Sequence, residues 1–158
     1  MSTSVLAPLN ARSAINSPAC IPFISVSVSV HADRQRLFQL LTVAEYMEAW
    51  LCFPRARRDD QIAITSDSDS FRIDHFRSRR MDFTITGQYR TCRRGKLQFT
   101  WRKDTPESSS TSAVQIRLYG DFERTKVCLT HSALNLHAER AWHEELWQAS
   151  LRRLTALC

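Results

Sequence analysis

The feature that most constrains the fold is a long amphipathic segment at the end of the chain, which follows a series of alternating segments. Residues 138–157 repeat apolar side chains every three to four positions, the spacing of a helix with one apolar face. The preceding segments alternate with a period of two, which predicts strands. Because the helix must bury its apolar face, and the sheet is the large surface available, we expect a curved sheet wrapped around a C-terminal helix.

A strand and two short helices are predicted before the main run of strands. Residues 23–31 alternate isoleucine and valine with serine, which indicates a strand with one buried face. Asp33 stands where the N-cap of a helix is expected. Residues 42–45 (Thr-Val-Ala-Glu) match a capping box, which would begin a second helix through Trp50 that ends before Pro54.

Six further strands are predicted by alternation and by the turn residues between them. They span 61–65, 71–77, 81–92, 96–103, 113–119 and 123–132, with an exposed loop over 104–112. Short turns between consecutive strands indicate an antiparallel meander, so the fold class is α+β. We expect residues 21–158 to form one domain, and residues 1–20, which lack periodicity, to form a disordered tail.

Composition and charge narrow the classes of partner. There is no run of about 18 apolar residues, so a membrane-spanning helix is not expected. The five cysteines are scattered without metal-ligand spacing, which indicates free thiols in a reducing cytoplasm and no structural metal. The net charge is +6, but the arginines are not interleaved with aromatic residues, so nucleic acid is not the expected partner. An acidic partner surface or an anionic ligand stays open.

Several short segments stand in a characteristic order and spacing. They are Ala32 to Thr42, Trp50, Gly87, Leu97 to Trp101, Thr125 to His131, and Trp142 to Trp147 with Leu151 and Leu154. In this order the chain resembles the START-like (SRPBCC) superfamily and, more narrowly, the homologues of the C-terminal domain of the chaperone ATPase activator. The resemblance covers residues 23–157 and implies a helix-grip fold. One departure is that no glycine lies between Pro54 and Gly87, where family members carry a glycine pair.

Alternation also assigns the side chains that would face the helix. Together they would form an apolar lining with a few polar groups, which is the usual composition of a small-molecule pocket. The alternative is that the same side chains meet and fill the space. The predicted ligand-binding residues are Trp50, Phe71, Ile73, His75, Phe83, Ile85, Tyr89, Phe99, Trp101, Leu129, His131, Trp142 and Leu146.

Three polar members of this set could orient a ligand or act in acid–base chemistry, namely His75, Tyr89 and His131. The alternative for His131 is a histidine at a strand end that is hydrogen-bonded to the backbone. No nucleophile motif and no phosphate-binding loop occurs. Alternation places Asp74 and Asp82 on the outward face, which weakens a paired-carboxylate site.

The sequence therefore favours a cytoplasmic domain that binds a small hydrophobic or amphipathic molecule between sheet and helix, with no catalytic residue, metal or cofactor assigned. The superfamily includes lipid and hormone binders, polyketide cyclases and chaperone cofactors, so two alternatives accompany this prediction. One is a cochaperone-like module that binds a chaperone through its basic surface. The other is a cyclase or hydrolase-type enzyme that uses His75, Tyr89 or His131. A homodimer formed through edge strands also stays open.

Overall fold

The computed structural model describes residues 23–158, and the tail expected over residues 1–20 lies outside the described residues. The predicted strands and helices are present, with ends that differ by a few residues. The helices are α2 (Arg34–Thr42), α3 (Ala44–Trp50) and α4 (His137–Leu157). The strands are β1 (Ile24–Val30), β2 (Gln61–Ser66), β3 (Ser70–Arg77), β4 (Arg80–Arg93), β5 (Lys96–Asp104), β6 (Ser109–Gly120) and β7 (Thr125–Ser132).

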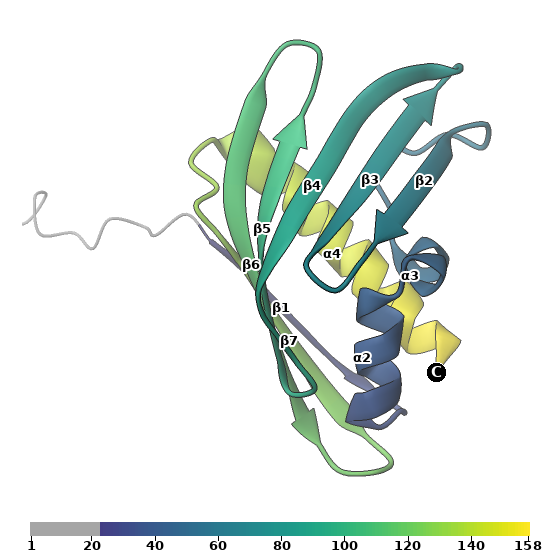
Figure 1. The fold of residues 1–158 in the computed structure, drawn as a ribbon, viewed down its shortest axis with the longest axis vertical. Coiled ribbons are helices and arrows are strands. Elements are labelled where there is room, and N and C mark those ends of the chain that lie inside the picture. The colour runs from purple at the N-terminus through teal and green to yellow at the C-terminus, as the bar shows by residue number, and fades with distance from the viewer. Residues whose placement is uncertain (1–22) are drawn as a thin grey trace, which may run out of the picture.

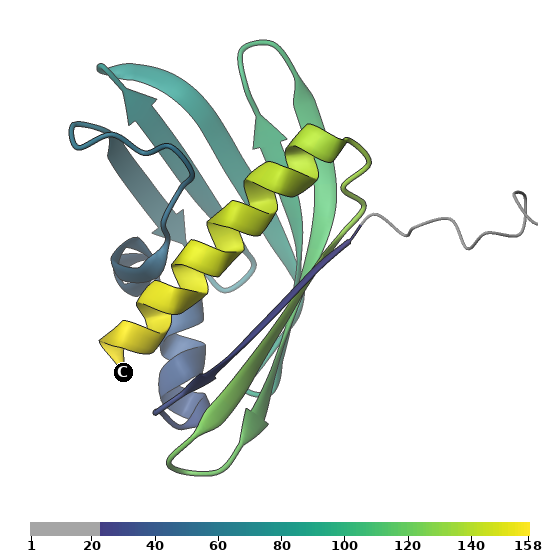
Figure 2. The same cartoon turned by 180° about the vertical axis from the view of Figure 1, so that it is seen from behind.

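All seven strands form one antiparallel sheet in the order β1-β7-β6-β5-β4-β3-β2. Strands β2 to β7 follow one another as a meander, and β1 joins the far edge by pairing with β7, so that Ile24 lies opposite His131. The sheet is strongly curved, and α4 lies across one of its faces (Figures 1 and 2). This arrangement confirms the predicted helix-grip fold.

The hydrophobic core lies between α4 and the sheet. Helix α4 buries Leu146, Trp147, Leu151 and Leu154 against the inward side chains of the strands, and its other side is exposed and charged. Helices contact both edge strands of the sheet. Helix α4 contacts β1, and α3 contacts β2 as well as α4. Among residues 23–158, no helix is long and apolar enough to cross a membrane.

The N-cap of α2 is as predicted, but the N-cap of α3 is not. The Asp33 side chain accepts a hydrogen bond of 2.8 Å from the Arg36 amide. The capping box predicted at Thr42 is wrong, because Thr42 still belongs to α2 and its hydroxyl donates to the Phe38 carbonyl. Helix α3 begins after Val43, and Ser66 of β2 accepts the hydrogen bond of the Ala44 amide at 3.1 Å.

Gly87 lies in the longest strand, β4, where neighbouring groups come very close to the backbone. A side chain at this position would overlap the ring of Phe71 and would lie 2.5 Å from the Thr100 carbonyl. The register between β4 and β5 shifts a few residues further along, between Tyr89 and Thr91. Glycine therefore lets the neighbouring strand and an aromatic ring approach the backbone at this position.

Candidate functional site

Eleven of the thirteen predicted ligand-binding side chains are buried in the core, whereas Tyr89 and Trp142 are partly buried. Only Phe71 and Phe99 of this set border the principal hollows of residues 23–158, and both of those hollows open on the surface. The structure brings most of the set together in three aromatic groups. Trp50 lies apart and ties α3 to α2, since its indole donates a hydrogen bond of 2.6 Å to the Leu40 carbonyl.

The first group is a buried network at the centre of the contact between α4 and the sheet. Trp147 donates a hydrogen bond of 2.9 Å to Nδ1 of His131, so the proton of that ring is on Nε2, which donates to the Ser112 hydroxyl at 2.6 Å. Ser112 in turn donates to the carbonyl of Trp101. His131 therefore has both ring nitrogens occupied by protein groups.

His143 completes this network from the helix. Trp101 donates a hydrogen bond of 3.0 Å to Nε2 of His143, which leaves the ring proton on Nδ1, where it donates to the Glu139 carbonyl at 2.7 Å. Burial lowers the pKa of His131 to about 2 and that of His143 to about 4. Both rings are neutral at pH 7, and the network is satisfied without a ligand.

The second group surrounds His75, near the C-terminal end of β3 and the N-terminal end of β4. The His75 ring stacks on Phe83 with ring centroids 4.6 Å apart, and Phe53 packs edge-on against both rings. Trp142 of α4 closes the group with its centroid 5.5 Å from that of Phe83. Three aromatic side chains and a histidine thus gather at one end of the contact between sheet and helix.

Two carboxylates flank the ring of His75. Asp60 lies 3.5 Å from Nε2, and Asp82 lies 3.3 Å from Nδ1. Neither approach has hydrogen-bond geometry, and Nδ1 is a buried atom with no hydrogen-bond partner among the described residues. Burial lowers the pKa of His75, although both carboxylates act in the opposite direction.

Asp82 reaches His75 because β4 bulges. His75 lies opposite Phe83, whereas the next residue of β3 lies opposite Met81, so Asp82 is the extra residue of a β-bulge. The prediction that Asp82 faces outward is therefore wrong, since simple alternation fails where a residue is inserted. Asp74 does face outward, where it pairs with Arg72 at 3.0 Å.

Lys103 and Glu139 form the polar border of the same group. The Lys103 ammonium lies 3.7 Å from the centroid of Trp142 and 3.8 Å from Oε2 of Glu139. Burial lowers the pKa of Lys103, and Glu139 and Asp82 offset part of this effect. Oε2 of Glu139 and Nε of Arg140 are two more buried atoms without a hydrogen bond among the described residues. The alternation of Leu97, Phe99 and Trp101 continues to position 103, so the inward place of Lys103 was readable from the sequence.

The third group consists of Phe71, Tyr89 and Phe99, whose ring centroids are 5.3 to 5.8 Å apart. Burial raises the pKa of Tyr89, so its hydroxyl is a weaker acid than that of an exposed tyrosine. In residues 23–158, no set of three or more His, Cys, Asp or Glu side chains is arranged to hold a metal ion.

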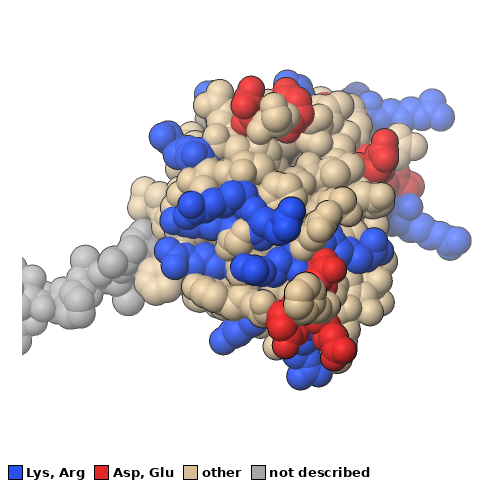
Figure 3. Space-filling view, turned by 60° about the horizontal axis from the view of Figure 1, so that its bottom comes forward, with Lys and Arg blue, Asp and Glu red and all other residues tan. Residues whose placement is uncertain are grey.

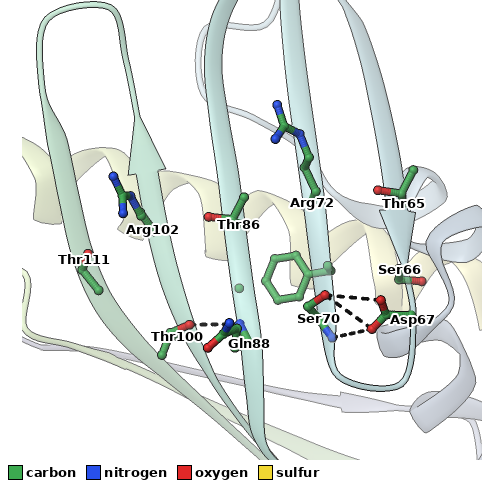
Figure 4. Close-up of a pocket in the computed structure, with 12 residues that line it drawn as sticks. Thr65, Ser66, Asp67, Ser70, Arg72, Thr86, Gln88, Thr100, Arg102 and Thr111 are labelled. Atoms are coloured by element: carbon green, nitrogen blue, oxygen red, sulfur yellow. Dashed lines mark hydrogen bonds between the residues drawn. The ribbon is translucent and has the colours of Figure 1, made fainter.

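A separate hollow of about 570 Å³ opens on the outer face of the sheet, away from α4. Figure 4 shows Arg72, Thr86 and Arg102 side by side on β3, β4 and β5, with α4 behind the sheet. Each of these arginines is paired with an aspartate two residues along its own strand. The hollow is polar and charge-compensated, which distinguishes it from the aromatic group around His75.

Comparison with known proteins identifies relatives of this architecture. The family model described as Activator of Hsp90 ATPase homolog 1-like protein matches residues 31–158. No curated protein matches the sequence significantly. The AHSA1 protein of Silicibacter pomeroyi superposes with a TM-score of 0.64 at 16% identity, over 84% of this chain and 96% of that one.

Two further solved structures share the fold. The Aha1 dimer of Colwellia psychrerythraea has a TM-score of 0.61 at 16% identity, over 84% of this chain and 92% of that one. DynU16, a protein of the dynemicin biosynthetic locus, has a TM-score of 0.61 at 20% identity. The match covers 85% of this chain but 46% of DynU16, so this chain spans less than half of that protein.

Proposed function

The chain belongs to the family of Activator of Hsp90 ATPase homolog 1-like proteins, and from this premise we propose that it binds a small amphipathic molecule between the sheet and α4. The apolar part of the molecule would pack against Phe53, Phe83 and Trp142. Its polar group would be held by His75 and Lys103. The helix-grip fold is commonly used for ligand binding, and this end of its interior carries the features that a ligand site needs.

The observation that carries the proposal is a cluster of incompletely bonded polar atoms beside apolar rings. Nδ1 of His75 and Oε2 of Glu139 are buried and make no hydrogen bond among the described residues. A buried polar atom without a hydrogen-bond partner reduces the stability of the folded protein by about 1–3 kcal/mol. Such atoms are rare in folded proteins, and two of them beside the same aromatic group support a binding site there. Trp142 is only partly buried, and a movement of its ring would open a path from solvent to these atoms.

The test is binding of the fluorescent probe 1-anilinonaphthalene-8-sulfonate, which has an apolar body and one anionic group. We expect saturable binding to the full chain, and a loss of at least about tenfold in affinity in Trp142→Ala and Lys103→Met. Lys126→Met is the matched control, because Lys126 is an exposed lysine on the outer face of the sheet. Equal affinity in all three variants would contradict the proposal. If the probe binds as expected, native mass spectrometry of the protein from its own host would identify the natural ligand.

A reaction at His75 is the second candidate. Of the three residues considered for catalysis, His131 has both ring nitrogens in hydrogen bonds to the protein, and burial makes the Tyr89 hydroxyl a weaker acid. His75 has a ring nitrogen without a hydrogen bond among the described residues, beside Asp82. An enzyme of this kind would lose turnover but keep probe affinity in His75→Gln. Loss of probe affinity alone would assign His75 to binding.

Three broader expectations remain proposals for this chain. The first is a cytoplasmic location, which is supported by the free thiols of Cys52, Cys92, Cys128 and Cys158. The Colwellia protein is a dimer, and the edge strand β2 of this chain would be available for self-association. A chaperone partner follows from the family name alone, and it would be tested by co-purification with a chaperone from the protein's own host.

A further inference from the structure

A row of cations crosses the outer face of the sheet at the end opposite the His75 group. Arg93 of β4 lies opposite Lys96 of β5, which lies opposite Arg117 of β6. Lys126 of β7 lies on the same face, opposite Tyr119. These four residues, Arg93, Lys96, Arg117 and Lys126, are called the cationic belt.

Among residues 23–158 the cationic belt has no acidic partners, unlike Arg72 and Arg102 on the same face. Arg72 and Arg102 pair with Asp74 and Asp104 at 3.0 and 3.1 Å. Among the described residues, no ion pair involves a side chain of the cationic belt. Figure 3 shows Lys and Arg side chains gathered in a band on the face around this end, with Asp and Glu at its margins.

This arrangement opposes folding. Like charges placed directly opposite one another on neighbouring strands repel, and the cationic belt holds two such pairs in succession. A single Asp or Glu in the row would relieve the repulsion, as Asp74 and Asp104 do elsewhere on the face. A partner that brings negative charge to this face would also relieve the repulsion.

Exposed aromatic side chains border the cationic belt. Tyr119 is 51% exposed beside Lys126, and Phe122, in the turn between β6 and β7, is 92% exposed. Phe122 stands between Asp121 and Glu123, so a uniformly anionic surface such as a phospholipid headgroup layer would repel the tip that carries it. A single nucleic-acid strand binds by stacking its bases on several aromatic rings, and among residues 23–158 only Tyr119 lies along the row. Aromatic anchors and arginines with mixed charges at the margin are typical of protein–protein interfaces.

We propose that the cationic belt, with Tyr119 and Phe122 at its border, docks an acidic segment of a protein partner. The site is independent of the proposed ligand site, because it lies on the opposite face of the sheet. Arginine forks would bind the carboxylates of the segment, and Phe122 would enter an apolar recess of the partner.

The repulsion within the row provides an unusual test. Arg117→Glu places a carboxylate opposite Lys96, so it should raise the urea midpoint of unfolding while it lowers affinity for the partner. The probe is a fluorescein-labelled peptide of alternating glutamate and phenylalanine, titrated with the full chain. We expect Arg117→Glu with Lys126→Glu to weaken peptide binding by at least about tenfold.

The control is Arg58→Glu with Arg152→Glu, which changes the net charge equally at exposed arginines outside the cationic belt. It should change affinity by less than about twofold, and an equal loss in both double variants would overturn the proposal. Phe122→Ser should weaken peptide binding without changing the urea midpoint. A wild-type protein that binds an oligothymidylate or phosphatidylserine vesicles more tightly than the peptide would overturn the assignment to a protein partner.

Discussion

The indole nitrogen of Trp147 donates a hydrogen bond of 2.9 Å to Nδ1 of His131, which joins α4 to β7 at the centre of the core. Trp147→Phe would remove the donor and leave a buried ring nitrogen without a partner. We expect a loss of about 3 kcal/mol in the free energy of unfolding, from the unsatisfied acceptor and the smaller ring together. Urea denaturation measures this loss.

Trp142→Phe is the control for that experiment. Trp142 is partly buried, and its indole nitrogen makes no hydrogen bond among the described residues. We expect a loss of about 1 kcal/mol or less. Similar losses in both variants would show that ring size, and not the bond to His131, determines the effect.

The same network predicts that the protein is sensitive to acid. The pKa values of His131 and His143 are about 2 and about 4 in the folded protein, below the ordinary value of 6.5. Below about pH 6.5 the unfolded chain therefore binds protons that the folded protein does not. The free energy of unfolding consequently decreases as the pH is lowered. The loss from His143 extends down to about pH 4, and that from His131 continues to about pH 2.

We expect each histidine to contribute a slope of about 1 kcal/mol per pH unit between about pH 6 and pH 5. Urea denaturation at a series of pH values measures the slope. His143→Gln keeps a side-chain acceptor and a donor but cannot titrate, so its slope should be smaller by that amount. An unchanged slope in this variant would show that His143 is not the group that titrates.

The surroundings of Gly87 leave no room for a side chain. In Gly87→Ala the added carbon would meet the Phe71 ring and the Thr100 carbonyl, and the latter belongs to the backbone and cannot turn away. We expect a loss of about 3 kcal/mol, measured by thermal and urea unfolding. In Gly95→Ala, by contrast, the nearest atom is Nη1 of Arg34 at 3.8 Å, so its stability should change little. Equal effects would contradict the close approach at Gly87.

Ser66 caps the N-terminus of helix α3 from a distant position in the sequence. Ser66→Ala would leave the Ala44 amide without its acceptor, at a cost of about 1 kcal/mol. The specific measurement is hydrogen exchange, in which the Ala44 amide should exchange faster while amides of the sheet are unaffected. Ser27→Ala, on the exposed side of β1, is the control. An Ala44 amide that exchanges at the wild-type rate would exclude this cap.

The fold was largely predictable because its signals are local. Alternation in β1 and the three-to-four spacing of α4 each depend on which side of one element is buried, and both predictions hold. The start of α3 was missed because its capping oxygen comes from Ser66, 22 residues further along the chain. No pattern around Thr42 contains that information.

The candidate site was predicted less completely, since its polar geometry depends on irregular backbone and on distant partners. Asp82 turns toward His75 only through a β-bulge, which alternation cannot anticipate. His143 was not assigned to the core, although it is 1% exposed, because a histidine becomes buriable once Trp101 and the Glu139 carbonyl satisfy its nitrogens. Lys103 could have been found by extending the alternation of β5.

The pairing of β1 with β7 has a consequence for synthesis on the ribosome. Val30 lies opposite Thr125 and Ile24 opposite His131, so the first strand waits for about a hundred further residues before its partner exists. During translation the meander from β2 to β6 can pair as it emerges, whereas β1 keeps an open edge until β7 has emerged. The alternating serines of β1 keep one side of that edge polar throughout the wait.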